Sequence, residues 1–335
     1  MTSEQKYPTL FSGFRVGSLE LKNRIVHASM TTRFARDGKV SAKLKHYFSN
    51  RAKGGVSIIV SEPINGHRYQ SDPRKLDVFN NRAARSLAAT VNALAKFDCH
   101  LLGQLQDNGR GRREQGRNNA AIGVSALPDD LSWTVPHVMS TQEVYQLLED
   151  FVLSCKNLKR SGLSGVEVSA GHGHLFHQFL SPWCNQRDDE FGGDLAGRTR
   201  FLGHLIQGIR DACGKDFLVG MKLPGADGIT GSIDEAEAFA IAEVLGAKAI
   251  DYWTFAWGSH SHTLYHHLPD AFGERTPYAK AIGKLRQASP KIATGALGYL
   301  TDPNEAERLL VDGKADLIML GRPLVTDPGW GVKAE

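Results

Sequence analysis

Eight short apolar stretches, rich in β-branched residues, recur along the chain, and each has the length of one β-strand. Their nearly continuous apolar character is typical of parallel strands that are buried on both faces. The predicted strands cover residues 24–30, 56–62, 99–106, 165–170, 217–223, 249–255, 291–296 and 315–320. Because amphipathic stretches separate most of them, the pattern predicts alternating strands and helices.

Capping signals mark the start of several predicted helices. Two sequence patterns are typical of a helix N-terminus: a serine with a glutamate three positions later, and an aspartate directly before a proline. Such starts occur at Ser140 with Glu143, at Ser232 with Glu235, and at Asp302 before Pro303. Eight strands with right-handed helical connections predict an α/β fold, a (β/α)8 TIM barrel, with a doubly wound sheet as the alternative. Without any linker or low-complexity tract, residues 1–335 are expected to form a single domain.

Composition narrows the class of protein. The chain has 41% hydrophobic residues, ordinary for a globular protein, and a net charge of only +4 with scattered basic residues, so we expect no nucleic-acid partner. Its four cysteines form no C-x-x-C pair, which argues against an iron–sulfur or zinc-ribbon site and against a disulfide scaffold. We see no signal peptide, and no apolar run approaches the roughly 20 residues of a membrane span. We therefore expect a cytoplasmic protein without membrane association.

Two long segments break the rhythm of strands and helices. Residues 107–139 and 171–200 follow the third and fourth predicted strands and are rich in Gly, Arg, Asn, Asp and Pro. In a barrel such segments lie at the carboxyl ends of the strands, where catalytic loops gather. Within the first segment, the basic run 109–117 is expected to be a solvated loop.

Polar residues at strand ends are the first candidates for chemistry. Gln104 and Lys222 lie in strands whose core-facing positions should be apolar. Lys222 either pairs with a carboxylate across the barrel mouth or faces an anionic ligand or cofactor ring, and the sequence leaves both open. Gly298 and Gly321 follow the last two strands, and Arg322 adds positive charge, as expected of a phosphate site.

Four segments then point to one family. They read "LKNRIVHASMTT" (21–32), "QLQDNGR" (104–110), "GVEVSAGHGHLFHQFLSPWCNQRDDEFGG" (165–193) and "GKADLIMLGRPLVTDP" (313–328). In this order they resemble motifs of the old yellow enzyme family, over residues 8–330. The family consists of FMN-dependent (β/α)8 oxidoreductases and includes the 2,4-dienoyl-CoA reductase and trimethylamine dehydrogenase branches.

The resemblance implies FMN as cofactor and assigns its binding residues. Each matches a family position beside the isoalloxazine ring or the phosphate. They are Ser29, Met30 and Thr31 in the first loop, Pro63, Gln104 at the pyrimidine edge, Lys222 near flavin N1, and Gly298, Gly321 and Arg322 at the phosphate. Lys222 stands where the family has an arginine, so the charge is kept and the bidentate fork is lost.

The substrate pocket is where the sequence departs from the family. Ene-reductases of this family carry His-x-x-His or His-x-x-Asn to bind the substrate carbonyl, and a tyrosine two residues later as proton donor. Here Ser169 and His172 stand for the pair and His174 for the tyrosine. We expect Ser169 to bind substrate and His172 and His174 to be catalytic, with His174 transferring a proton as a group that titrates near neutrality. His177 is expected to pack beneath the loop.

A second group of residues resembles the trimethylamine dehydrogenase branch. Trp257 matches a tryptophan of its aromatic bowl, which can hold an alkylammonium, and His260 stands where that branch has an acidic residue. We expect both to bind substrate. The histidine-rich run 259–267 is expected to be a loop over the pocket rather than a zinc site, because no matching Asp, Glu or Cys lies nearby, and no metal is expected.

These observations leave three hypotheses for the function of the protein, each of which involves a small-molecule substrate or ligand. In the leading one, NADH or NADPH passes hydride to flavin N5, which reduces an activated alkene or related acceptor. The alternative is a flavin-dependent amine dehydrogenase or demethylase acting on a methylated amine, with an electron-transfer partner; Trp257 favours it. These 335 residues contain no counterpart of that branch's iron–sulfur segment, which favours the reductase. The third hypothesis is a barrel that only binds a ligand.

Several properties stay open on sequence alone. They are the physiological substrate, the direction of the substrate half-reaction, the choice between NADH and NADPH, and the oligomeric state. The sequence is compatible with a homo-oligomer. Whether the sequence is part of a longer chain with iron–sulfur and further domains also stays open.

Overall fold

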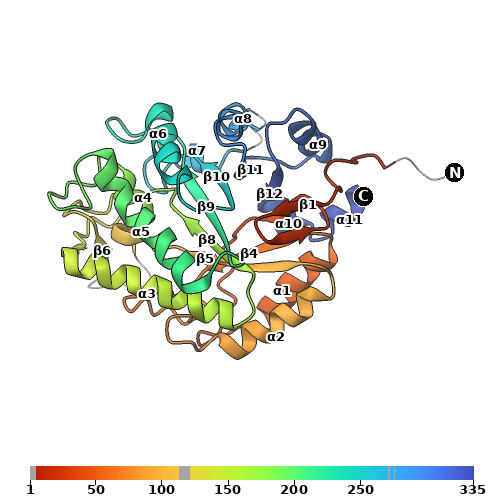
Figure 1. The fold of residues 1–335 in the computed structure, drawn as a ribbon, viewed down its shortest axis with the longest axis horizontal. Helices are drawn as coiled ribbons and strands as arrows, with labels where there is room; N and C mark the ends of the chain where they lie inside the picture. The colour runs from red at the N-terminus through yellow and green to blue at the C-terminus, as the bar shows by residue number, and fades with distance from the viewer. Residues whose placement is uncertain (1–4, 113–120, 271, 275) are drawn as a thin grey trace.

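Eight parallel strands form a closed barrel in the computed structural model, which describes residues 5–112, 121–270, 272–274 and 276–335 (Figure 1). In chain order the barrel strands are β3 (Ile25–His27), β4 (Ile58–Pro63), β5 (His100–Leu105), β8 (Gly165–Ser169), β9 (Leu218–Pro224), β10 (Tyr252–Ala256), β11 (Ala293–Ala296) and β12 (Leu317–Leu320). Each lies within a predicted strand or exceeds it by one residue. The TIM barrel is confirmed, and the doubly wound alternative is excluded because β12 pairs with β3 and closes the sheet.

Helices surround this barrel. The longer ones are α1 (Ala42–Lys53), α2 (Ala84–Ala95), α3 (Thr141–Arg160), α5 (Leu195–Cys213), α6 (Glu235–Gly246), α8 (Ala279–Ala288) and α9 (Pro303–Val311). Shorter elements are η1 (Gly109–Gly111), α4 (Leu175–Leu180), α7 (Leu264–His267), α10 (Arg322–Thr326), α11 (Trp330–Ala334) and the two-stranded pair β6 (Ile122–Gly123) and β7 (His137–Val138). Apolar side chains between the helices and the outer faces of the strands form the larger core.

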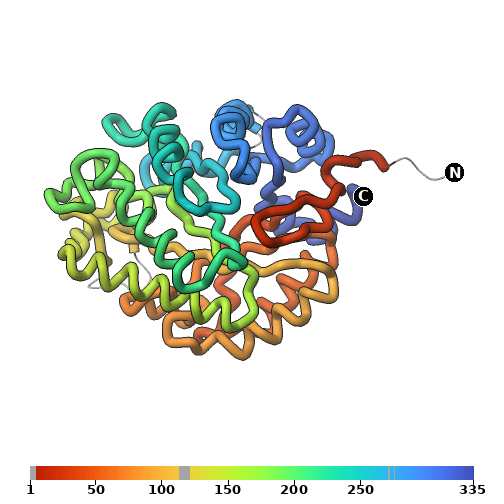
Figure 2. Tube along the Cα trace, viewed as in Figure 1, coloured from red at the N-terminus to blue at the C-terminus, as the bar shows by residue number. Residues whose placement is uncertain are grey.

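A hairpin of β1 (Phe14–Val16) and β2 (Leu19–Leu21) closes one end of the barrel (Figure 2). Val16 and Leu21 pack into the apolar cluster of the barrel interior. Ser18 at the turn donates a hydrogen bond to the Asp216 carbonyl, just before β9 begins. Because this hairpin covers the amino ends of the strands, the carboxyl ends remain for a site.

Two of the three predicted helix starts are confirmed. The Ser140–Glu143 capping box begins α3, with the backbone N–H of Ser140 donating to Glu143 at 2.8 Å, and Asp302 caps α9. At α6 the prediction is wrong, because Asp234 rather than Ser232 is the N-cap. The Asp234 carboxylate accepts from the Glu237 backbone N–H at 2.8 Å, whereas the hydroxyl of Ser232 donates to the Asp227 carboxylate at 2.5 Å.

The basic run 109–117 is only partly described, and its described arginines are not solvated. Arg110 and Arg112 are buried, and each pairs with a carboxylate, Asp130 for Arg110 and Asp107 for Arg112. The expectation of a solvated loop is therefore wrong for these two residues, since buried arginines need such partners. Residues 113–117 of the run lie outside the described residues. None of the helices in the described part of the chain is both long and apolar enough to cross a membrane.

Candidate active site

Two adjoining chambers lie at the carboxyl ends of the barrel strands. The central chamber has a volume of about 400 Å³ and the outer chamber about 250 Å³. Both are lined by Ser29, Met30, His172, Lys222, His267 and Leu268. Because the two chambers share these walls, they lie side by side.

All the site residues predicted from the sequence line one of these chambers. The central chamber is lined by Ser29, Met30, Thr31, Pro63, Gln104, Ser169, His172, His174, Lys222 and His260. The outer chamber is lined by Ser29, Met30, His172, Lys222, Trp257, Gly298, Gly321 and Arg322. The structure thus brings together residues that are spread over almost 300 positions of sequence.

The base of the central chamber is a polar network on the barrel strands, which we call the floor: Gln104, Glu167, Lys222 and Tyr252. Glu167 on β8 is its centre and is fully buried. One carboxylate oxygen, Oε1, accepts a hydrogen bond from Gln104 Nε2 at 2.8 Å and lies 3.6 Å from Lys222 Nζ. The other oxygen, Oε2, accepts from the Tyr252 hydroxyl at 2.9 Å. Lys222 therefore both pairs with a carboxylate and faces the site, so the two alternatives left open by the sequence coexist.

Two further contacts hold the floor in place. Ser29 Oγ donates to Gln104 Oε1 at 2.9 Å, which connects the loop after β3 to β5 and fixes the orientation of the amide. Gly220 on β9 gives Tyr252 room to reach Glu167, because a Cβ atom at that position would lie 2.1 Å from the tyrosine ring. Burial beside the Glu167 carboxylate raises the pKa of Tyr252 well above its usual value. The tyrosine hydroxyl therefore stays protonated and donates a hydrogen bond to Glu167.

The first loop is positioned by Glu62 at the end of β4. One oxygen of this carboxylate, Oε2, accepts from the backbone N–H groups of Thr32 and Arg33 at 2.8 and 2.7 Å. Burial raises the pKa of Glu62. These contacts hold the segment Ser29–Thr31 against the chamber.

At the far end of the outer chamber, glycine backbone and one arginine are available for an anion. Gly298 has a φ of +103°, which favours glycine, and Arg322 follows Gly321 at the end of β12. The exposed Arg322 guanidinium lies 5.9 Å from the Tyr299 ring. This is the environment expected of a phosphate site.

Trp257 lines the outer chamber. Its ring is stacked on that of Tyr278 with 4.0 Å between centroids and 3° between planes. His174 and His260 line the central chamber instead, so Trp257 lies nearer the glycine–arginine end than these two histidines do.

The loop after β8 is held in an uncommon backbone conformation. His172 has a φ of +66°, a region that few non-glycine residues adopt. Its carbonyl accepts from the His260 backbone N–H at 3.0 Å, which joins this loop to the one after β10. His177 lies beneath the loop as expected: it is buried, its Nδ1 accepts from the Gly173 N–H, and its Nε2 lies 3.1 Å from the Asp227 carboxylate.

Four imidazoles from these two loops, which we call the roof, cover the central chamber: His172, His174, His260 and His267. The His172 and His267 rings are in contact, with 3.7 Å between centroids. His174 lies 6.3 Å from His172 and 6.1 Å from His260 by the same measure. Burial lowers the pKa of His174 to about 3 and that of His267 to about 4, and lowers the pKa of His172 well below its usual value.

These values correct one expectation about His174. It does not titrate near neutrality, because burial and the neighbouring His260 and His267 disfavour its charged form. At physiological pH it is a neutral imidazole with one N–H donor and one acceptor nitrogen. The same applies to His172, which is a neutral donor rather than an imidazolium.

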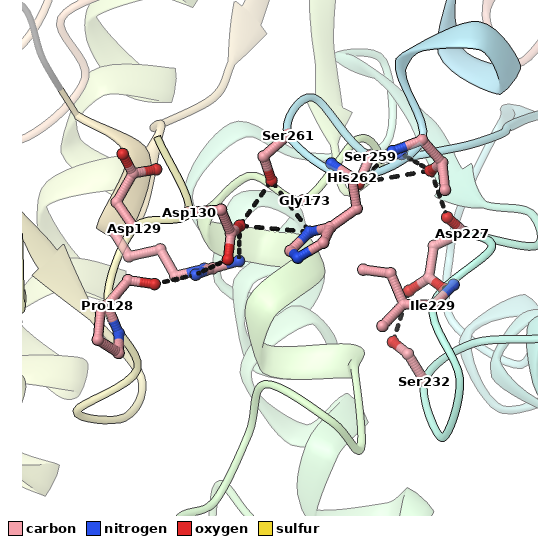
Figure 3. A network of polar contacts seen from close by, with 12 residues as sticks. Pro128, Asp129, Asp130, Gly173, Asp227, Ile229, Ser232, Ser259, Ser261 and His262 are labelled. Atoms are coloured by element: carbon pink, nitrogen blue, oxygen red, sulfur yellow. Dashed lines mark hydrogen bonds and ion pairs between the residues drawn. The ribbon is translucent and has the colours of Figure 1, made fainter. Parts of the chain in front are cut away.

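A carboxylate clasp, centred on Asp130, joins the loop after β5 to the loop after β10 (Figure 3). Asp130 Oδ2 lies 2.6 Å from Arg110 Nη2, accepts from Ser261 Oγ at 2.7 Å, and lies 3.3 Å from His262 Nδ1. Asp130 and Arg110 come from the segment after β5, whereas Ser261 and His262 come from the segment after β10. The clasp therefore holds the loop that carries His260 and His267.

The donor set fits FMN. Gln104 offers an oriented amide, Lys222 a cation, and the Gly321–Arg322 end a phosphate site, all lining the two adjoining chambers. No group of three or more His, Cys, Asp or Glu side chains in the described residues is arranged to hold a metal ion.

Sequence reasoning missed Glu167 and gave His267 no role of its own. Glu167 shares one face of β8 with Ser169, because the side chains of a strand alternate, so a charged residue there was a usable signal. His267 is seen only as part of the histidine-rich run 259–267, which does lie over the pocket as predicted.

Comparison with known proteins agrees with this geometry. The model of the NADH:flavin oxidoreductase / NADH oxidase family matches residues 9–335. An NADPH dehydrogenase of Bacillus subtilis (strain 168) is 29% identical over 324 residues, covering 95% of this chain and 92% of the relative. An NADH oxidase of Thermoanaerobacter brockii is 28% identical over 336 residues, covering 98% of this chain.

A solved structure also superimposes over nearly the full chain. The complex of 2-naphthoyl-CoA reductase with 2-naphthoyl-CoA has a TM-score of 0.89 and 25% identity, and the match covers 98% of this chain and 52% of that one. The chain likewise spans 51% of the NADH oxidase, about half of its length. The resemblance to old yellow enzymes is confirmed, and the chain belongs to the NADH:flavin oxidoreductase / NADH oxidase family.

Proposed function

We propose that this protein is an FMN-dependent oxidoreductase that uses NADH or NADPH to reduce an activated alkene or a related small-molecule acceptor. The observation that carries the proposal is the charge of the site. Among the described residues that line the two chambers, Lys222, Arg322, Arg33 and Lys75 are basic, and none is Asp or Glu.

This charge distribution favours an electron-rich or anionic substrate group. A carbonyl oxygen gains negative charge as its conjugated alkene is reduced, and nearby cations and N–H donors stabilise that charge. An alkylammonium would lie beside Lys222, which pairs with the buried Glu167 of the floor, and would meet no Asp or Glu among the described residues that line the two chambers. The stacked Trp257–Tyr278 pair supports the amine alternative, and it lies towards the phosphate end.

Each part of the site has a task in this proposal. FMN, when bound, supplies a centre that accepts hydride from NAD(P)H and returns it to the acceptor. Lys222 and Gln104 hold the ring, and the cation of Lys222 stabilises the negative charge of its reduced form. His172 and His174 face the substrate as neutral hydrogen-bond donors. The relatives termed NADPH dehydrogenase and NADH oxidase support a nicotinamide reductant but do not choose between its two forms.

Anaerobic stopped-flow spectroscopy tests the proposal. We expect NADH or NADPH to bleach the flavin absorbance of the purified protein, and cyclohex-2-enone to restore it. Bleaching by trimethylamine or dimethylamine, but by neither nicotinamide, would replace the proposal with the amine dehydrogenase, which then requires an electron-transfer partner. A protein without flavin absorbance and without affinity for added FMN would refute both enzyme hypotheses.

A further inference from the structure

The peptide group that joins His172 to Gly173, in the loop after β8, is held at both of its polar ends. Its N–H, on Gly173, donates to His177 Nδ1 at 3.2 Å. Its C=O, on His172, accepts from the backbone N–H of His260 at 3.0 Å. The φ angles of His172 and Gly173 are +66° and +80°, and at a non-glycine residue such a conformation persists only where the surrounding structure fixes it. The place of His172 therefore depends on these two contacts.

The contact to the Gly173 N–H depends on the side chain of Asp227, on the loop after β9. A backbone N–H can only donate, so His177 Nδ1 is unprotonated and the N–H of the ring is on Nε2. Nε2 lies 3.1 Å from Asp227 Oδ2 and donates to it, and both side chains are buried. Asp227 thus fixes the tautomer and the orientation of His177, in the way that the aspartate of a Ser-His-Asp triad orients its histidine. These two residues form the first arm.

The contact to the His172 carbonyl depends on the backbone of the same aspartate, which lies beside the turn at Ser259 (Figure 3). Thr263 Oγ1 donates to the Asp227 carbonyl at 2.5 Å and accepts from the Ser259 N–H at 2.7 Å. Ser259 directly precedes His260, so this hydroxyl holds the turn that presents the His260 N–H. This second arm therefore starts at the same residue and ends on the same peptide as the first.

Asp227 is itself firmly held. Its Oδ1 accepts from the Ile229 N–H at 2.9 Å, and its Oδ2 accepts from the Ser232 hydroxyl at 2.5 Å. Burial alone would raise the pKa of Asp227, but the hydrogen bonds from His177, Ser232 and the Ile229 N–H lower it, so the carboxylate stays ionised. Asp227 lines neither the central nor the outer chamber, so it acts through other residues and not on the substrate directly.

We propose that Asp227 is the positioning residue of the roof and that it places His172 by fixing both ends of the His172–Gly173 peptide. The inference rests on the proposed function, which gives His172 its contact with the substrate. Without either arm, the backbone of His172 can relax towards a more common conformation and carry the ring away from its place. No residue of either arm lines the two chambers, so cofactor binding should not depend on the arms.

Asp227→Asn tests the first arm. If the amide oxygen keeps its contact with the Ile229 N–H, the NH2 group faces His177 Nε2. The imidazole then accepts at Nε2 and carries its N–H on Nδ1, where it opposes the Gly173 N–H. The matched control is Ser232→Ala, which removes one hydrogen bond to the same carboxylate but belongs to neither arm.

The second arm is tested with a pair of variants at Thr263. Thr263→Val keeps the shape of the side chain and removes the hydroxyl, so the link between the Asp227 carbonyl and the Ser259 N–H is lost. Thr263→Ser keeps the hydroxyl and should restore this link. All variants are assayed as FMN-loaded protein with equal flavin content.

The first measurement is amide hydrogen exchange by mass spectrometry, without substrate, on peptides that contain Gly173 or Ser259. We expect faster exchange at Gly173 in Asp227→Asn and at Ser259 in Thr263→Val, in each case by about tenfold, the worth of one hydrogen bond. Thr263→Ser and Ser232→Ala should stay within about threefold of the wild type at these amides.

The second measurement is stopped-flow kinetics of the two half-reactions. Misplacement of a positioned group can cost up to about 100-fold in rate, so we expect Asp227→Asn and Thr263→Val each to slow reoxidation by cyclohex-2-enone about 10- to 100-fold. Thr263→Ser should recover most of this loss. Reduction by NAD(P)H should change by less than about threefold in all variants, whereas a general structural role would slow both half-reactions together.

Three results would overturn the proposal. They are a Thr263→Ser variant as impaired as Thr263→Val, an Asp227→Asn variant that behaves like Ser232→Ala in both measurements, and equal slowing of both half-reactions. If wild-type reduced protein is not reoxidised by cyclohex-2-enone, the proposed function fails on this acceptor. Hydrogen exchange still decides on the two arms in that case.

Discussion

The floor and the roof of the site are both polar, but they satisfy their polar groups in different ways. On the floor, Glu167 accepts hydrogen bonds from Gln104 and Tyr252 and pairs with Lys222. On the roof, His172 and His267 each keep an Nδ1 without a partner in the described chain. The polar groups of the floor lie on barrel strands and bind one another, whereas the roof is built on two loops. We infer that the floor serves the cofactor, which is common to every turnover, and that the roof selects the substrate.

The largest effect is expected where the floor is broken. Lys222→Met leaves Glu167 buried without its cation, and removing one partner of a buried pair typically costs about 3–5 kcal/mol. We expect the free energy of unfolding in urea to fall by about that amount and FMN to bind more weakly. Lys222→Arg, which keeps the charge, is the control.

A double variant sharpens this result. In Lys222→Met with Glu167→Gln, neither charge remains, so most of the lost stability should return while FMN affinity stays low. If the single variant unfolds like the wild type, Glu167 and Lys222 do not stabilise each other and the floor is not one interdependent network.

A smaller effect is expected from loosening the roof. Asp130→Asn keeps the shape of the side chain but removes the negative charge that Arg110, Ser261 and His262 share. The loop that carries His260 and His267 should then be held less firmly, and small displacements of positioning groups can cost up to about 100-fold in rate. We expect about a tenfold slower oxidation by cyclohex-2-enone in stopped flow, with a higher KM and unchanged reduction by NAD(P)H.

A milder change to the clasp, Ser261→Ala, can be compared with Asp130→Asn. Ser261→Ala removes one hydrogen bond to Asp130 and leaves the carboxylate, so its effect should be a few-fold at most. An equal slowing of both half-reactions in Asp130→Asn would show that the clasp supports the whole site rather than the roof.

The division between floor and roof also marks what could be predicted from the sequence. The strands were predictable because apolar runs have a fixed length and spacing, and strand ends placed Gln104 and Lys222 at the site. The capping box at Ser140 was predictable because its contacts are local. At α6, Ser232 had an equally local signal, but Asp234 caps the helix and Ser232 is hydrogen-bonded to Asp227 instead.

The sequence did not predict the features of the site that depend on long-range electrostatic interactions. Nothing local in the sequence showed that burial keeps His174 neutral, or that Arg110 and Arg112 of a basic run are buried against Asp130 and Asp107. These outcomes depend on which loops meet above the barrel, and the sequence pattern of loops does not determine that.

A further predicted effect concerns the pH dependence of stability. The pKa values of His174 and His267 in the folded protein, about 3 and about 4, lie below the usual value of 6.5. As pH falls below about 6.5, the unfolded chain therefore takes up protons before the folded chain does. Their contribution to stability is complete above about pH 6.5 and decreases on acidification, by up to about 1.4 kcal/mol per pH unit for each group.

Urea unfolding at several pH values between about 7 and 5 measures this slope. We expect His174→Asn and His267→Asn each to flatten it, because asparagine does not titrate. An unchanged slope in both variants would mean that these rings take up protons over the same pH range in the folded and the unfolded protein, which contradicts the lowered pKa values.

The central claim is that the roof acts on the substrate and the floor on the cofactor, and His172→Ala tests it most directly. The two half-reactions are measured separately in anaerobic stopped flow, with NADH or NADPH for reduction of the bound flavin and cyclohex-2-enone for its reoxidation. Removing one donor to a developing oxyanion typically costs about 100- to 1,000-fold. We predict a loss of this size in reoxidation with reduction changed by less than about threefold. Equal losses in both half-reactions would contradict the claim.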